Sequence, residues 1–233
     1  RENEKSQQKA IIERGERLDK IIASKQMSAK TRTKFLKAVQ LLQAKLTEIV
    51  SEKLPGTRFE ICGSCVTGLF SEESDVDLSI HIPKSQLPSK KPVVNVIKGI
   101  IRKSLMFKSL VSIPQAKIPV LKGCYVSKEN PTKNGTLSFD ICVANDMAVF
   151  NSQLLRDYAM VDERTKSVMM AVNTWAKENG VSAAANGHLS TYGWTNMTIF
   201  YLQHIGLLPN LQCPELMRTT GIDSKSDDPS SRI

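Results

Sequence analysis

The sequence lacks any apolar run that approaches the roughly 18 residues needed for a membrane-spanning helix, so we expect that no segment crosses a bilayer. We also expect no membrane partner. Its ten prolines and twelve glycines among 233 residues are too few for a collagen-like or low-complexity chain. Its five cysteines are an odd number in a chain much longer than a disulfide scaffold. We therefore expect reduced thiols and an intracellular protein.

Positive charge is in excess and concentrated in one segment. The 32 lysines and arginines outnumber 23 aspartates and glutamates, which gives a net charge of +9. The cluster favours a polyanion such as nucleic acid, nucleotide phosphates or an anionic membrane face, although solvated surface lysines would give the same composition. Its eleven basic residues, with Glu129 as the one acid among them, are Lys84, Lys90, Lys91, Lys98, Arg102, Lys103, Lys108, Lys117, Lys122, Lys128 and Lys133.

Apolar periodicity predicts helices at both ends of the chain and an α/β segment between them. Apolar residues at helical spacing predict helices over 11–22, 35–50, 93–110, 154–175 and 189–202, with Ser28 as an N-cap. Short apolar-rich runs bounded by turn residues predict strands at Phe59–Cys62, Val76–Ile82, Ile118–Leu121 and Leu137–Val143. The last ten residues, 224–233, are polar and read as a linker or a cut end.

The order of these elements predicts an α+β fold with two lobes and a cleft between them. We expect residues 55–145 to form a lobe with a small mixed sheet and flanking helices. Residues 1–54 and 146–233 would form a discontinuous helical lobe, incomplete at its C-terminal end.

Three aspartates carry the strongest chemical signal. Side chains two positions apart on a strand share a face, so Asp75 and Asp77 present adjacent carboxylates. Such carboxylates repel each other unless cations hold them, and hard oxygen ligands suit Mg²⁺ or Mn²⁺. Asp140 lies in an alternating apolar strand, where an isolated acid is costly without a partner. A neighbouring metal site would supply that partner.

A glycine–serine pair precedes these aspartates. Gly63 at a strand-to-helix turn lets the backbone approach a ligand, and the helix that begins at Ser64 offers unpaired N–H groups to a phosphate. Gly-Ser and Asp-x-Asp are each common in turns. Their joint spacing, with ten residues between them and a strand-borne aspartate some sixty residues later, favours a catalytic site. Cys62 and Cys65 have no second pair, so we interpret them as buried thiols rather than zinc ligands.

This pattern resembles the DNA polymerase β-like nucleotidyltransferase superfamily. Five later motifs are similar to the central domain of noncanonical poly(A) polymerases and terminal uridylyltransferases, most of all the compact trypanosomatid uridylyltransferases. The resemblance runs from about Phe59 to Leu211 and implies a bi-lobed nucleotidyltransferase. The motifs are Asn151-Ser152-Gln153-Leu154-Leu155, Tyr158, Asp162-Glu163-Arg164, Trp175-Ala176-Lys177 and Leu189-Ser190-Thr191-Tyr192-Gly193.

The resemblance implies a role for each matching residue. Two Mg²⁺ or Mn²⁺ ions would be held by Asp75 and Asp77, with Asp140 binding one ion and activating an RNA 3′-hydroxyl. Nucleotide-binding residues would be Gly63 and Ser64 at the triphosphate, Asn151 with Ser152 at the ribose, Lys177 and Thr191 at the β/γ-phosphates, and Tyr192 on the base. Simpler interpretations stay open: Ser64 and Ser152 as helix caps, Lys177 as a surface lysine, and Tyr192 as a core aromatic.

The chain departs from the family pattern at two positions of the expected nucleotide site. Asn173 stands where a phosphate-directed lysine is usual, which removes a positive charge. Thr191 replaces the more usual serine and keeps the hydroxyl.

The resemblance implies template-independent transfer of UMP from UTP to the 3′ end of single-stranded RNA. Adenylation from ATP, as in a poly(A) polymerase, is the second interpretation, and a catalytically inactive RNA-binding subunit is the third. The three aspartates argue against the third. We also expect membership of an RNA-processing or editing complex. The first residue, Arg1, leaves room for a removed leader that would suit a mitochondrial protein, and a cytoplasmic location is equally consistent.

Overall fold

The computed structural model describes residues 2–25, 27–87, 92–128, 130 and 135–215. The chain divides into two compact units, Arg1–Asp157 and Tyr158–Ile233. Three lysines of the basic cluster, Lys90, Lys91 and Lys133, and the polar end at 224–233 lie outside the described residues. Every helix in the described ranges is too short or too polar to cross a bilayer.

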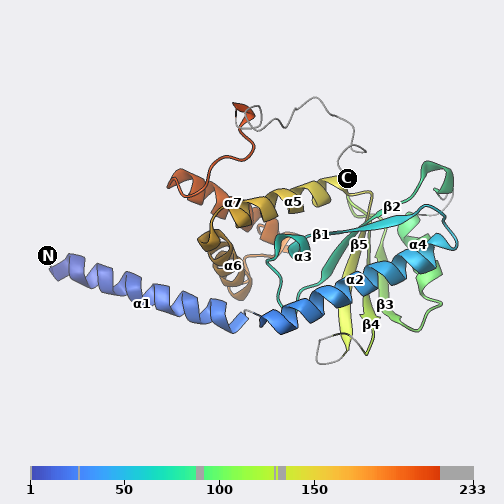
Figure 1. The fold of residues 1–233 in the computed structure, drawn as a ribbon, viewed down its shortest axis with the longest axis horizontal. Helices are drawn as coiled ribbons and strands as arrows, with labels where there is room; N and C mark the ends of the chain where they lie inside the picture. The colour runs from blue at the N-terminus through green and yellow to red at the C-terminus, as the bar shows by residue number, and fades with distance from the viewer. Residues whose placement is uncertain (1, 26, 88–91, 129, 131–134, 216–233) are drawn as a thin grey trace. The chain divides into compact units, whose positions relative to one another are not determined.

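The first unit contains a five-stranded mixed sheet with the strand order β1-β2-β5-β4-β3 (Figure 1). β2 and β5 are parallel, and the other neighbouring strands are antiparallel. The α+β expectation is thus confirmed. The strands are β1 Arg58–Cys62, β2 Val76–His81, β3 Phe107–Ile113, β4 Val120–Val126 and β5 Thr136–Val143. The helices of this unit are α1 Glu2–Lys25, α2 Ala29–Ser51, the single turn α3 Ser64–Thr67, the 3₁₀ turn η1 Lys84–Gln86, α4 Val93–Ile101 and most of α5 Asp146–Val161.

The hydrophobic core lies between one face of the sheet and the helices α2 and α4. Ser28 caps α2 as expected, because its hydroxyl accepts the Thr31 N–H at 3.1 Å. The apolar stripe of α2, which includes Phe35 and Leu42, is fully buried against the sheet. Alternate residues of the strands face this core. The residues between them face the opposite side of the sheet, where the candidate site lies.

One expected helix is wrong in its second half. The chain was expected to be helical over 93–110, but α4 ends at Ile101 and β3 begins at Phe107. The apolar–polar alternation of β3 is interrupted by a bulge between Lys108 and Val111, where Ser109 has φ 53°. The bulge inserts extra residues into the period-two pattern, so the segment imitates a helical spacing.

Helix α2 belongs to the first unit, which differs from the expected helical lobe made of residues 1–54 and 146–233. Its buried side chains share one core with those of the sheet, and the unit boundary falls after Asp157 within α5. An amphipathic pattern fixes which face of a helix is buried, but it does not specify the surface that covers that face.

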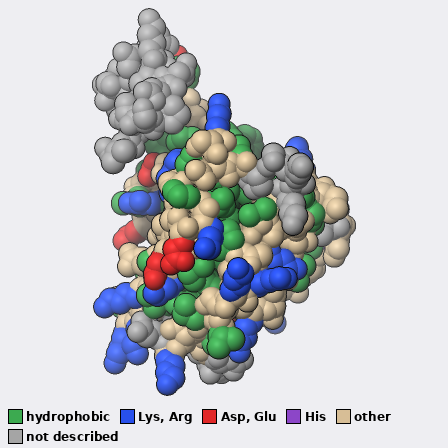
Figure 2. All heavy atoms as spheres, turned by 90° about the vertical axis from the view of Figure 1, so that its right-hand side faces the viewer, with side chains coloured by type: hydrophobic (Ala, Val, Ile, Leu, Met, Phe, Trp, Pro, Cys, Tyr) green, Lys and Arg blue, Asp and Glu red, His purple; other side chains and the backbone are tan. Residues whose placement is uncertain are grey.

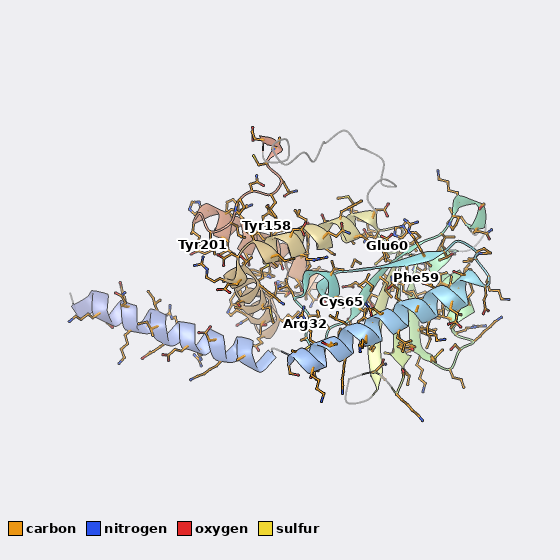
Figure 3. The ribbon with its side chains drawn as sticks, viewed as in Figure 1. Arg32, Phe59, Glu60, Cys65, Tyr158 and Tyr201 are labelled. Carbon is orange, nitrogen blue, oxygen red and sulfur yellow. The ribbon has the colours of Figure 1, made fainter. Side chains whose placement is uncertain are left out.

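The second unit is helical and is built on the packing of α6 Glu163–Glu178 against α7 Thr191–His204. Trp175 and Trp194 meet edge to face with ring centroids 5.5 Å apart. The hydroxyl of Tyr158 (Figure 3) accepts hydrogen bonds from the Gln203 amide at 3.0 Å and from the Leu211 N–H at 3.1 Å. The loop between the helices includes the 3₁₀ turn η2 Ala184–Asn186.

Candidate active site

A row of side chains crosses four strands of the sheet on the face opposite the core. Asp77 pairs in register with Asp140 of the parallel strand β5, and Asp140 pairs with Lys122 of β4. Cys62 of β1 pairs with Asp77 at the other end of the row. Asp75 lies two residues before Asp77, just before β2 begins, and its charge acts on the Asp77 carboxylate. The parallel pairing of β2 and β5 therefore brings the three predicted aspartates together, and we call Asp75, Asp77 and Asp140 the aspartate row.

The carboxylates of this row repel one another. Burial, followed by the charges of Asp140 and Asp75, raises the pKa of Asp77 from 3.8 to about 6, and Lys122 opposes the shift. As the side chains stand, no three histidine, cysteine or acidic side chains among the described residues are arranged to hold a metal ion. The Lys122 ammonium contacts the Asp140 carboxylate.

The chemistry of this donor set fits hard divalent cations. The three acidic residues offer only carboxylate oxygens, which Mg²⁺ and Mn²⁺ prefer. Burial and the neighbouring carboxylates raise the pKa of Asp77, and a bound cation would favour its ionised form. The assignment of Asp75, Asp77 and Asp140 as metal ligands remains a prediction that this geometry supports.

The metal-free protein should lose stability as pH rises through about 6. The folded-state pKa of Asp77, about 6, lies above its ordinary 3.8, so the folded state binds this proton more tightly than the unfolded state. The stabilisation is present below pH 3.8 and is lost as pH rises through 6, at most about 3 kcal/mol for this shift. Urea unfolding in EDTA from pH 4 to pH 8 would measure the loss.

Asp77→Asn is the control for this pH dependence. The variant should unfold with a flatter pH profile, and saturating Mg²⁺ should reduce the loss in the wild-type protein, since the cation favours the ionised carboxylate. An identical slope in both proteins would show that Asp77 does not cause it.

Gly63 is required by the geometry of the turn between β1 and α3. Its φ of 66° and ψ of −146° are accessible to glycine and costly for other residues. A Cβ at this position would collide with the carboxylate of Asp77. The Gly63 N–H donates to the Ser152 hydroxyl at 2.7 Å, and that hydroxyl donates to the Ala148 carbonyl. Helix α5 thus holds the turn against the aspartate row.

Ser152 has a different place from the one expected at the nucleotide. Its side chain is buried, and its hydroxyl hydrogen bonds join α5 to Gly63. We therefore interpret Ser152 as a residue that positions the turn. Ser64, the first residue of α3, and Asn151 on α5 are partly exposed. These two side chains remain available to a ligand.

The thiols on either side of this turn are free. Cys62 is buried, as expected from the single Cys-x-x-Cys spacing, whereas Cys65 is only half-buried. Burial, the largest cause in each, raises the pKa of Cys62 and of Cys65 to about 12. Thiols that resist ionisation are poor nucleophiles and poor zinc ligands. They act as small apolar groups beside the aspartate row.

The segment between the turn and the aspartates is anchored by a contact that the sequence did not reveal. Phe70 is buried against Phe35 of α2, with ring centroids 5.0 Å apart and nearly parallel planes. The Arg32 guanidinium lies 4.5 Å from the centroid of the Phe70 ring, a cation–π contact. Arg32 on α2 also lies beside α3, which carries Cys65 (Figure 3). The start of α2 therefore restrains the segment that leads to Asp75.

The four candidate residues of the second unit differ in exposure. Asn173 is buried, and its amide donates to the Thr195 hydroxyl at 2.9 Å, so it joins α6 to α7. This packing role differs from the expected place at the nucleotide. Lys177 in the last turn of α6 is exposed, and 46% of Tyr192 is exposed, which rules out the core interpretation of the tyrosine. Thr191 begins α7, with its hydroxyl 3.2 Å from that of Ser182.

Lys122 is the residue of the site that sequence reasoning missed. It was counted in the basic cluster but placed outside the strand expected at 118–121, whereas β4 runs from Val120 to Val126. The sequence signal for this strand was the alternation of Leu121 and Tyr125, which are buried, with the charged Lys122, which is exposed. That alternation places Lys122 on the polar face, and only the register pairs it with Asp140.

A family model for the central palm domain of mitochondrial-like poly(A) RNA polymerases matches residues 16–160, more than half of the chain. The chain belongs to this family. The matched residues of this chain include the sheet, the Gly63 turn and all three aspartates. The match ends near the boundary between the two structural units.

Curated relatives include both poly(A) and uridylyl transferases. "Caffeine-induced protein 16" of Schizosaccharomyces pombe is 36% identical over 152 residues, or 64% of this chain and 12% of that protein. "Poly(A) RNA polymerase GLD2" of Danio rerio is 30% identical over 190 residues, covering 79% of this chain and 37% of the relative. "Terminal uridylyltransferase cid1" of S. pombe is 29% identical over 187 residues, 75% of this chain and 44% of the relative. The chain thus spans less than half the length of each.

Solved structures share the fold of this chain. The Cid1 poly(U) polymerase superimposes with a TM-score of 0.71 at 23% identity, covering 87% of this chain and 61% of Cid1. GLD-2, in its complex with GLD-3, gives a TM-score of 0.67 at 22% identity, covering 88% of this chain and 63% of GLD-2. The bi-lobed nucleotidyltransferase fold expected from the sequence is confirmed.

Proposed function

We propose that the chain is a template-independent nucleotidyltransferase that extends the 3′ end of single-stranded RNA and releases pyrophosphate. The observation that carries the proposal is the registered pair Asp77–Asp140, with Asp75 near enough for its charge to raise the pKa of Asp77. The Gly63 turn lies against this row. In this proposal the turn would receive the phosphates beside the carboxylates that a phosphoryl-transfer enzyme needs.

The three aspartates and the Gly63 turn would divide the mechanism between them. Asp75 and Asp77 would hold two Mg²⁺ or Mn²⁺ ions, and Asp140 would share one of them. When bound, the ions supply the positive charge that lowers the pKa of the RNA 3′-hydroxyl and stabilises the departing pyrophosphate. The Asp140 carboxylate would accept the hydroxyl proton. Gly63, which has no side chain, would let the triphosphate approach the backbone of the turn, with Ser64 beside it.

The second unit supplies the residues we propose for the nucleotide itself. The exposed ring of Tyr192 would stack on the base, and the exposed Lys177 would neutralise the β/γ-phosphates. Thr191 would donate its hydroxyl to the phosphates. Asn151, on α5, would bind the ribose. Asn173 is excluded from this set, because its amide is buried against Thr195.

The basic cluster would guide the RNA. Between positions 84 and 128 the described residues include eight lysines and arginines and no acid. Figure 2 shows lysine and arginine side chains spread over one face of the molecule with few acidic ones among them. A polyanion bound in this way releases counter-ions, so its affinity should fall as salt is raised.

UTP is the substrate that we propose, from the likeness of the central motifs to uridylyltransferases. ATP is the second candidate, because relatives named as poly(A) RNA polymerases are as similar as those named as terminal uridylyltransferases. An inactive RNA-binding subunit is the third. The aspartate row, complete and in register, argues against it.

Primer extension tests the proposal. A 5′-labelled single-stranded RNA is incubated with Mg²⁺ and each of the four nucleoside triphosphates in turn. We expect extension with UTP, and none with the double variant Asp75→Asn and Asp77→Asn. Extension with ATP alone would keep the mechanism and replace the substrate. A folded protein that binds RNA but extends it with no nucleotide would contradict enzymatic activity in this chain.

We also propose that the protein works within an RNA-processing or editing complex. The GLD-2 neighbours were solved with GLD-3 and with RNP-8, which supports partnering of this kind. Affinity purification of the full-length protein from its native cells, with and without ribonuclease, would test it. The mitochondrial or cytoplasmic location stays a prediction that cell fractionation would decide.

A further inference from the structure

Lys122 is positioned to form an ion pair with the aspartate row when no metal is bound. Its ammonium contacts the Asp140 carboxylate through the register of β4 with β5. The lysine side chain is 49% exposed, whereas that of Asp140 is 20% exposed. The lysine therefore reaches from solvent to a carboxylate that is mostly buried, and its charge also acts on Asp75 and Asp77.

A lysine ammonium and a divalent cation compete for the same carboxylate oxygens. The ammonium carries one charge and donates hydrogen bonds, whereas Mg²⁺ or Mn²⁺ carries two charges and binds several oxygens at once. Because the Lys122 stem is flexible and half exposed, its ammonium can leave Asp140 for solvent without movement of the strand.

We propose that Lys122 is the internal counter-ion of the metal-free site, and that a divalent cation displaces its ammonium from Asp140. This inference rests on the metal site of the proposed function. It makes Lys122 a positioning residue that holds Asp140 in place without metal. The lysine stabilises the metal-free protein and weakens the binding of the metal.

The test measures metal binding and thermal unfolding of the full chain, without RNA or nucleotide. Lys122→Met removes the charge and keeps a long apolar side chain, and Lys122→Gln is a second neutral variant. Lys117→Met, which removes an exposed lysine outside the strands, is the matched control. Mn²⁺ affinity is measured by electron paramagnetic resonance of free Mn²⁺, and the Tm is measured in EDTA and in saturating Mn²⁺.

Both neutral variants should bind Mn²⁺ roughly tenfold more tightly than the wild type, the effect of removing one charge near the ion in a partly hydrated site. Their Tm in EDTA should fall by a few degrees, about what the loss of one partly exposed ion pair costs, and saturating Mn²⁺ should restore it. The control should match the wild type in both measurements.

Two results would overturn the inference, and they are distinguishable. If Asp140→Asn abolishes Mn²⁺ binding while both neutral variants bind no more tightly than the wild type, the counter-ion role is wrong and the metal site stands. If Mn²⁺ binding does not depend on Asp140, the metal site of the proposed function fails together with the inference.

Discussion

Asp140→Asn is expected to lower the rate of nucleotide transfer by at least roughly a thousandfold and to leave the fold intact. Asparagine keeps the shape of the side chain, but it can neither take the hydroxyl proton nor lend its charge to a cation. The core lies on the other face of the sheet and is not altered. Single-turnover extension of a labelled RNA would measure the rate, and circular dichroism would verify the fold.

Asp157→Asn is the matched control for this substitution. It removes one exposed carboxylate of α5 from the same unit. Asp157 is separate in the sequence from the three aspartates of the row. The control should retain the wild-type rate. A rate for Asp140→Asn within tenfold of the wild type would show that Asp140 neither binds a catalytic metal nor serves as the general base.

Gly63→Ala is expected to have the second largest effect, on both stability and transfer. The alanine would occupy a conformation that costs about 1–3 kcal/mol, and its methyl group would collide with the Asp77 carboxylate. Relief requires Asp77 or the turn to move, and either shift disrupts the aspartate row. We expect a Tm several degrees lower and a transfer rate reduced by roughly a hundredfold or more.

Gly187→Ala separates the two causes. Gly187 has φ 81° and ψ 5°, a left-handed conformation, and a Cβ there would meet nothing within 4 Å. This control carries backbone strain of about 1–2 kcal/mol but no collision. It should unfold slightly earlier and transfer nucleotides normally. If Gly63→Ala behaved like Gly187→Ala in the transfer assay, the collision with Asp77 would have no catalytic importance.

The fold was predicted well where local patterns and burial agree. Ser28 and the apolar stripe of α2 predicted a capped helix with one buried face, and that helix is present. The strands around Asp77 and Asp140 were predicted from their alternation. β3 was missed because the bulge at Ser109 breaks the alternation on which the prediction depends.

The acidic residues of the candidate site were predicted from the sequence, whereas the residues that support them were missed. The spacing of Asp75, Asp77 and Asp140 indicated one cluster, which the parallel pairing of β2 with β5 produces. The contact of Lys122 with Asp140 depends on the register of β4, and the link between Ser152 and Gly63 joins residues 89 positions apart. Neither register nor such a contact has a local signature in a single sequence.

The sequence by itself determined most of the helical and extended segments, the acidic residues on and beside two strands, and the glycine turn before them. These features follow from period, spacing and backbone preference, which act over a few neighbouring residues. Only the tertiary structure decided that α2 covers the sheet, that Lys122 meets Asp140, and that Asn173 is buried against Thr195. Those outcomes depend on which surfaces bury each other, and that is a property of the whole chain.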